Sequence, residues 1–104
     1  MNSHGRLVDG LSLDQELERA EKGFGTSYLT HGRAVAFMDF CSAKGLTLTW
    51  LEAFEVRAEY LQMTEFSVLD LFGRVEAREL DQIVRKSVQA AIDTGLEFYF
   101  VFWV

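Results

Sequence analysis

The chain has 104 residues, of which 49% are hydrophobic and 25% are charged, and its formal net charge at pH 7 is −6. This length and composition predict one soluble globular domain over residues 1–104, and we expect residues 1–10 to be disordered or partly tag-derived. The negative charge argues against direct binding to nucleic acid or to an acidic membrane, since both attract basic surfaces. It favours a basic protein as the partner.

The cysteine content and the apolar runs bear on where the protein works. A single cysteine cannot form an internal disulfide, which fits a reducing compartment. No apolar run reaches the roughly 18 residues that a membrane-spanning helix needs, and the N-terminus lacks the pattern of a signal peptide. We therefore expect a cytoplasmic protein.

The first expected helix covers about residues 13–22. Ser12 and Gln15 have the spacing of a capping box, and Gly23 stands where a helix commonly ends. Residues 23–29, GFGTSYL, then predict a loop with a short extended piece.

A second helix is expected over about residues 31–44, with Thr30 as its N-cap and Gly45 after its last turn. Its apolar residues recur at helical spacing, which predicts a buried stripe. They are Ala34, Phe37, Met38 and Cys41.

Residues 46–57, LTLTWLEAFEVR, alternate in the way of a strand that is covered on one side. One face of this strand carries Leu46, Leu48, Trp50, Glu52, Phe54 and Val56. A single carboxylate thus interrupts an apolar and aromatic row.

The last third of the chain predicts a long helix, with Gly73 before it and Gly95 after it, and then a closing strand. Residues 65–72 favour a short helix or a turn, and residues 75–94 carry the strongest helical stripe of the chain. Residues 96–104 are apolar on both faces, which is typical of a central strand. An additional strand is expected from residues 6–11, from Tyr28 or from residues 58–63.

The order strand, long helix, strand predicts a crossover that leaves the two strands parallel. The predicted fold class is α/β, with α+β as the alternative. We expect a small mixed or partly parallel sheet with helices packed on it and the closing strand in its centre.

The residues that often carry chemistry do not form a catalytic or metal site. Cys41 and His31 lie ten residues apart on one expected helix, roughly 15 Å, so they cannot touch, and Cys41 is expected to be a buried, inert thiol. His4 and His31 lack the spacing of zinc ligands. The sequence therefore predicts a protein that is not an enzyme and needs no cofactor or metal.

Two further motifs are weak as sites. Residues 23–27, GFGTS, have the glycine spacing of a phosphate loop, but they follow a helix and lack the lysine. Glu52 and Glu55 are three apart on a strand, so they point to opposite faces and do not act as a carboxylate pair.

Glu52 is more informative alone, because a carboxylate buried in an apolar row costs several kcal/mol unless it is paired. In the first alternative, Glu52 reaches water or is neutralised by Arg33 or Arg57. In the second, it is presented to a partner beside aromatic side chains. The sequence leaves both alternatives open.

Residues 52–81 hold most of the negative charge, with eight acids against three bases, a net charge of −5. Such a stretch is either a solvated face or a docking surface. Trp50, Tyr60, Leu61 and Met63 accompany the acids, and apolar anchors within a charged rim are typical of binding patches.

Residues 34–45 (AVAFMDFCSAKG), 50–54 (WLEAF) and 60–72 (YLQMTEFSVLDLF), followed by an aromatic strand at the C-terminus, resemble small acidic bacterial immunity proteins of colicin-type and contact-dependent toxin systems. The resemblance covers about two thirds of the chain, from Ala34 onward. It implies a cytoplasmic inhibitor that masks the active surface of a toxin. Glu52 and the acids after it are the contacts that it implies.

The preferred hypothesis is an acidic, immunity- or antitoxin-like inhibitor that binds a basic partner protein. Trp50 and Tyr60 would anchor the partner, and the field that speeds encounter would come from Glu52, Glu55, Glu59, Glu65 and Asp70.

Three other hypotheses stay open. The first is a phage-type inhibitor of a nucleic-acid-binding complex, in which acids stand in for phosphates. The second is a domain that binds a small ligand or acts on it, with Glu52 in an aromatic pocket beside Trp50 and Phe54. The third is a dimer formed through the aromatic closing strand, in place of a monomer.

Overall fold

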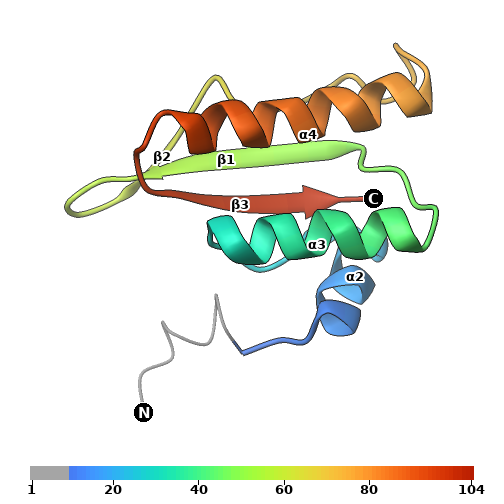
Figure 1. The fold of residues 1–104 in the computed structure, drawn as a ribbon, viewed down its shortest axis with the longest axis horizontal. Helices are drawn as coiled ribbons and strands as arrows, with labels where there is room; N and C mark the ends of the chain where they lie inside the picture. Colours follow the sequence, from blue (N-terminus) through green and yellow to red (C-terminus); the bar gives the residue numbers. More distant parts are fainter. Residues whose placement is uncertain (1–9) are drawn as a thin grey trace.

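The computed structural model describes residues 10–104, so the expectation for the segment before them lies outside the described residues. Three helices and three strands make up this part of the chain (Figure 1). In chain order they are α2 (Leu13–Glu21), α3 (His31–Ala43), β1 (Trp50–Val56), β2 (Leu61–Met63), α4 (Ala77–Asp93) and β3 (Phe98–Trp103).

The helix boundaries follow the capping signals of the sequence. The Ser12 hydroxyl accepts a hydrogen bond from the backbone N–H of Gln15, and the Gln15 side chain accepts one from the backbone N–H of Ser12, so the capping box is confirmed. Gly45 and Gly95 follow the ends of α3 and α4. The three expected helices are therefore confirmed to within two residues at each end.

The expected strand over residues 46–57 is shorter in the structure, and residues 65–72 form turns, which is one of the two expected forms. This second segment runs beside β1, where Val68 and Leu51 exchange two backbone hydrogen bonds of 2.8 and 3.0 Å. The chain therefore continues along the same edge of β1 after β2 has ended.

The sheet has the order β2-β1-β3, and both neighbouring pairs are antiparallel. The predicted parallel pairing is wrong, and β1 rather than the closing strand is the central strand. The reason is the hairpin before β2, which reverses the chain before α4 begins. The helix thus connects β2 to β3, which run in the same direction on either side of β1. The mixed α+β architecture with helices packed on a small sheet is as expected.

The outer edge of β3 carries backbone hydrogen bonds from the segment over residues 26–29. Thr26 N–H donates to the carbonyl of Phe102 at 3.0 Å, and Leu29 and Phe100 exchange two bonds of 2.8 Å. Of the expected sources for an additional strand, residues 58–63 supply β2 and the Tyr28 segment supplies this strip, while residues 6–9 of the third lie outside the described part. A dimer through the edge of β3 would have to displace the strip.

The helices α3 and α4 pack on one face of the sheet. In Figure 1, α4 runs alongside β1 and α3 runs alongside β3. The phenyl rings of Phe37 on α3 and Phe102 on β3 have centroids 5.4 Å apart. The strands contribute to this core the fully buried side chains of Leu51, Ala53, Phe98, Phe100 and Phe102. The alternating residues of β1 and β3 therefore point to the opposite face.

A buried carboxylate joins α2 to the strip that borders β3. Glu16 is fully buried, and it accepts hydrogen bonds from both the backbone N–H and the hydroxyl of Ser27. The N–H bond is 2.8 Å long. Because buried polar groups are costly without partners, this contact fixes the strip relative to the helix.

Replacing Glu16 with alanine should lower the free energy of unfolding by about 1 to 3 kcal/mol, because two donors of Ser27 lose their acceptor. Urea denaturation followed by circular dichroism measures the change. Glu18→Ala is the matched control, since Glu18 lies on the same helix in a solvent-exposed ion pair with Lys22, and such pairs contribute about 0 to 1 kcal/mol. Equal losses in the two variants would contradict the role of Glu16.

Candidate partner-binding site

The sheet face opposite α3 and α4 is rich in aromatic side chains. We call it the open face and define it by Tyr28, Trp50, Glu52, Phe54, Tyr99, Val101 and Trp103. An antiparallel sheet with one wet face usually carries polar residues there, yet Glu52 is the one charged residue of this set. Except for Val101, which is buried, its members are partly exposed. The helices α3 and α4 pack on the other face, whereas α2 and the loop after it border the open face near Val101 and Trp103.

Edge contacts between aromatic rings hold the open face together. The Tyr28 ring packs edge-on against Phe54, with centroids 5.6 Å apart, and tilts against Tyr99 at 6.2 Å. At the other end of β1, Trp50 and Trp103 lie directly opposite in the register, with ring centroids 6.1 Å apart at 68°. The rings are therefore positioned by the sheet before any partner arrives.

The Trp103 indole packs against the loop over residues 23–27, where Gly25 makes room for it. Its Nε1 donates a hydrogen bond of 3.0 Å to the carbonyl of Gly23. Gly25 has a φ of 77°, and a Cβ placed there would lie 2.6 Å from Cζ2 of Trp103. The GFGTS motif thus has a packing explanation in this fold.

Glu52 lies in the middle of the open face, with an indole as its hydrogen-bond partner. Trp50 Nε1 donates to its Oε2 at 3.3 Å. Neither expected arginine neutralises it: Arg57 forms an ion pair with Glu55 at 3.3 Å, and Arg33 donates to the carbonyl of Leu11. Within the described residues no ion pair includes Glu52. Glu52 is partly exposed, and neither of the two expected arginines neutralises it.

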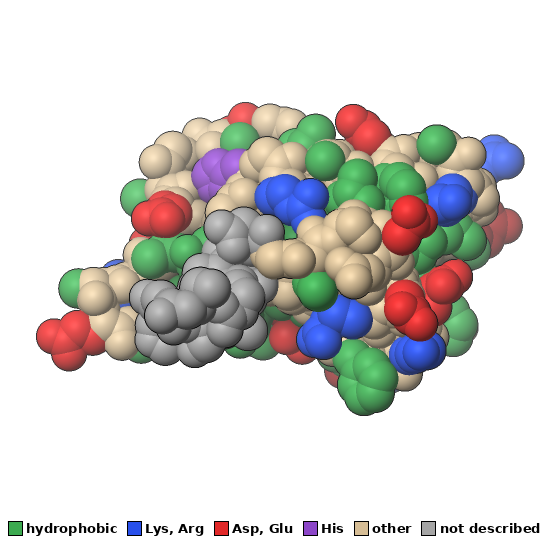
Figure 2. All heavy atoms as spheres, turned by 90° about the horizontal axis from the view of Figure 1, so that it is seen from below, with side chains coloured by type: hydrophobic (Ala, Val, Ile, Leu, Met, Phe, Trp, Pro, Cys, Tyr) green, Lys and Arg blue, Asp and Glu red, His purple; other side chains and the backbone are tan. Residues whose placement is uncertain are grey.

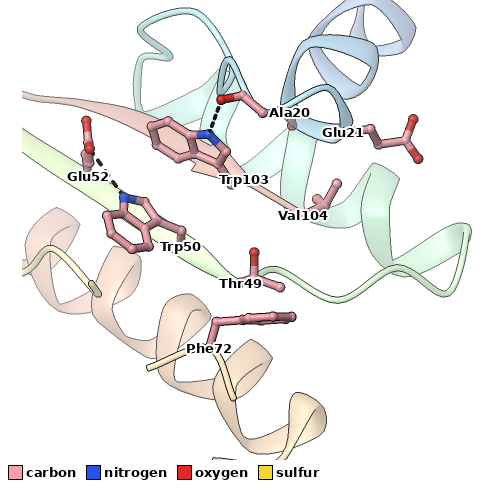
Figure 3. A pocket seen from close by; sticks show the side chains of 9 residues that line it. Ala20, Glu21, Thr49, Trp50, Glu52, Phe72, Trp103 and Val104 are labelled. Carbon is pink, nitrogen blue, oxygen red and sulfur yellow. Dashed lines mark hydrogen bonds between the residues drawn. The ribbon is translucent and has the colours of Figure 1, made fainter. Parts of the chain in front are cut away.

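Two hollows share Glu52 and Trp103 as lining residues. The first has a volume of about 500 Å³ and is shown in Figure 3, where Glu52 and Glu21 lie at opposite ends and Phe72 lies across from Trp50. The second, of about 580 Å³, lies among side chains of α2, of the loop after it and of the open face. It is lined by Leu11, Arg19, Phe24, Thr26, Ser27, Tyr28, Glu52, Val101 and Trp103.

The remaining expected site residues do not join Glu52 on the open face. Glu55 points to the helix side of the sheet, opposite Phe98 in the register, as the alternation predicts. Glu59 and Tyr60 lie in the hairpin at the far end of β1 from Trp50 (Figure 1).

Glu65 and Asp70 are exposed in the turns that follow β2. We call Glu59, Tyr60, Glu65 and Asp70 the acidic edge, and the exposed apolar side chain of Leu69 is next to Asp70 in the chain. The acids of residues 52–81 are thus spread over several surfaces, and Asp81 is bound to Arg85 at 2.8 Å. The side of the molecule in Figure 2 likewise mixes acidic and basic side chains.

Sequence reasoning missed three aromatic residues at the hollows. The apolar closing segment predicts a central strand around Trp103, whereas its indole forms the wall between the hollows. Phe72 and Phe24 are 72% and 68% exposed and line one hollow each. The alternation of the closing strand contains the signal for Trp103, since it shares a face with Tyr99. Nothing in the local pattern marks the other two.

Cys41 and His31 have structural roles. Cys41 is fully buried, and this burial raises the pKa of its thiol to about 11. His31 Nε2 accepts a hydrogen bond of 3.2 Å from the backbone N–H of buried Phe98. In the described part of the chain, no three potential metal ligands cluster together, and no helix is long and apolar enough to cross a membrane.

The raised pKa predicts slow alkylation of Cys41. The thiolate is the reactive form, and at any pH below about 11 the folded protein holds less of it than an ordinary thiol. Iodoacetamide at pH 8 should modify the native protein far more slowly than the protein unfolded in guanidinium chloride, as measured by mass spectrometry. Equal rates would show that the thiol is accessible in the fold.

Gly25→Ala tests the cradle of Trp103. The methyl group would meet the indole ring and the backbone would keep a positive φ, so we expect a loss of about 2 kcal/mol or more in the free energy of unfolding. Gly32→Ala is the control, because its methyl group would extend into open space and alanine favours the helix. If Gly25→Ala is as stable as the control, the close approach of the indole is not a constraint.

No family model, curated protein or solved structure matches the chain.

Proposed function

We propose that the protein is an acidic, immunity-type inhibitor that binds a basic partner protein on its open face. In this proposal it works in the cytoplasm, masks the active surface of a toxin, and neither catalyses a reaction nor needs a cofactor. The observation that carries the proposal is the group of partly exposed aromatic side chains around Glu52 on the sheet face opposite α3 and α4.

Physical chemistry supports a binding role for such a face. Aromatic side chains are enriched at protein interfaces, and tryptophan is among the residues whose loss costs most binding energy. Trp50 and Trp103 are held by the strand register, so little side-chain entropy is lost when a partner packs on them.

Charge favours a basic partner. The chain carries a net charge of −6, and the acidic edge extends the negative field beyond the open face. Charges outside the contact mainly speed encounter, whereas desolvated anchors slow dissociation. We therefore divide the expected residues into two roles: Trp50 and Glu52 contact the partner, and Glu59, Glu65 and Asp70 attract it.

The test uses a basic toxin encoded beside this protein. Co-expression should relieve its toxicity, and the purified proteins should form a 1:1 complex. Trp50→Ala should weaken the complex by roughly 30-fold or more, chiefly through faster dissociation. Trp50→Phe, which keeps an aromatic ring, guards against a loss of fold and should weaken it less.

The triple variant Glu59→Gln, Glu65→Gln, Asp70→Asn should act differently. We expect slower association by up to about tenfold at low salt, little change in dissociation, and a difference that disappears as salt is raised. Glu18→Gln on α2 is the control for a single lost charge. Binding that is insensitive to Trp50 and to salt, or no binding to any basic toxin, would contradict the proposed function.

A second candidate function is binding of a small ligand, and the hollow beside Glu52 favours it. Its volume of about 500 Å³ lies within the range of ligand sites, which is roughly 300 to 1,000 Å³. Phe54, which the sequence placed in such a pocket, lines neither hollow. Submicromolar affinity for a free small molecule in the absence of any protein partner would favour this candidate.

A further inference from the structure

We propose that the hollow lined by Trp50, Trp103 and Glu52 receives one cationic side chain, an arginine or a lysine, from the partner. This inference rests on the proposed function and specifies the chemistry that the partner must present at one point of the open face.

The hydrogen-bond donors of the two indoles are already used inside the protein. Trp50 Nε1 donates to Glu52, and Trp103 Nε1 donates to the carbonyl of Gly23 (Figure 3). What the indoles offer to a ligand is therefore their rings. The faces of these rings carry partial negative charge and attract ammonium and guanidinium groups.

The polar atoms of the hollow that are still free to bind a ligand are mainly hydrogen-bond acceptors. Glu52 accepts one hydrogen bond from the described residues, whereas a carboxylate has about four acceptor positions. Glu21 is a second carboxylate in the lining, and no lysine, arginine or histidine of residues 10–104 lines this hollow. A ligand must therefore supply donors and positive charge, because an anion would meet two carboxylates and no base.

The form of the hollow suits a side chain that enters from a larger partner. Phe72, which is 72% exposed, and Trp50 provide apolar surface for the methylene stem of arginine or lysine. The second hollow shares Glu52 and Trp103 with the first, so the recess extends beyond the space that one cation fills. An extended segment of a protein can occupy both, with its cation next to Glu52.

The first experiment measures this chemistry without a partner. ¹⁵N-labelled protein is titrated with N-acetyl-arginine amide or N-acetyl-lysine amide at constant ionic strength, and the indole N–H signals of Trp50 and Trp103 are followed. We expect saturable shifts with a Kd on the order of 1 to 10 mM. N-acetyl-citrulline amide, which has the shape of the arginine derivative without its charge, should bind at least about tenfold more weakly.

Glu52→Gln identifies the carboxylate that is responsible. Glutamine keeps an oxygen acceptor for Trp50 Nε1, so the fold is preserved while the charge is removed. The affinity for the arginine derivative should fall roughly tenfold, because hydrogen bonds to charged groups contribute more than neutral ones. Glu18→Gln, the same change on the exposed surface of α2, should leave the affinity unchanged.

The second experiment uses the toxin complex and separates the two proposals. The inference predicts that Glu52→Gln weakens the complex and that replacing one arginine or lysine of the toxin by an uncharged residue has no additional effect in this variant.

Equal binding of the arginine and citrulline derivatives, or no effect of Glu52→Gln on either, would overturn the inference. A tight complex that is indifferent to Glu52→Gln would overturn it too, while the proposed function would stand. Failure of every basic toxin to bind, with Glu52-dependent binding of the free arginine derivative, would overturn the proposed function and assign the hollow to a free cation.

Discussion

The antiparallel register of β1 and β3 determines which side chains form the core and which form the open face. It places Leu51 opposite Phe102 on the helix side and Trp50 opposite Trp103 on the open side. Because side chains alternate along a strand, a slip of one residue would exchange the two faces of β3. The phenylalanines would then be exposed and the indole would lie in the core. One register thus specifies both the core and the candidate site.

Contacts at the outer edge of β3 maintain this register. The strip over residues 26–29 is bonded to the outer edge of β3, and the buried carboxylate of Glu16 holds the strip against α2. The loop before the strip provides the glycine against which the Trp103 indole packs. The helix α2 therefore supports the open face through the strip, and the two hollows form where the loop after α2 meets the sheet.

Local signals in the sequence were sufficient for the helices but not for the strand order. The capping box at Ser12 and the apolar stripe of residues 75–94 depend on residues that are close in the sequence, so contacts between distant segments do not change the helices that they predict. The direction of β3 relative to β1 follows from the chain reversal at β2. This strand has only three residues, too few for a recognisable alternation of polar and apolar side chains. The candidate site, too, was predictable only where local patterns determine it. Alternation placed Glu52 among aromatic residues, whereas Trp103, Phe72 and the buried role of Glu16 depend on contacts between distant segments.

In the proposed complex, a basic partner covers the open face around Glu52 and leaves the acidic edge exposed. Hydroxyl-radical footprinting of the free protein and of its complex with the toxin tests this directly, since it reports the solvent exposure of aromatic side chains. The account predicts that Trp50, Trp103 and Phe72 are protected in the complex while Tyr60 in the hairpin stays as reactive as in the free protein. Protection of Tyr60 with unchanged reactivity of both tryptophans would contradict it.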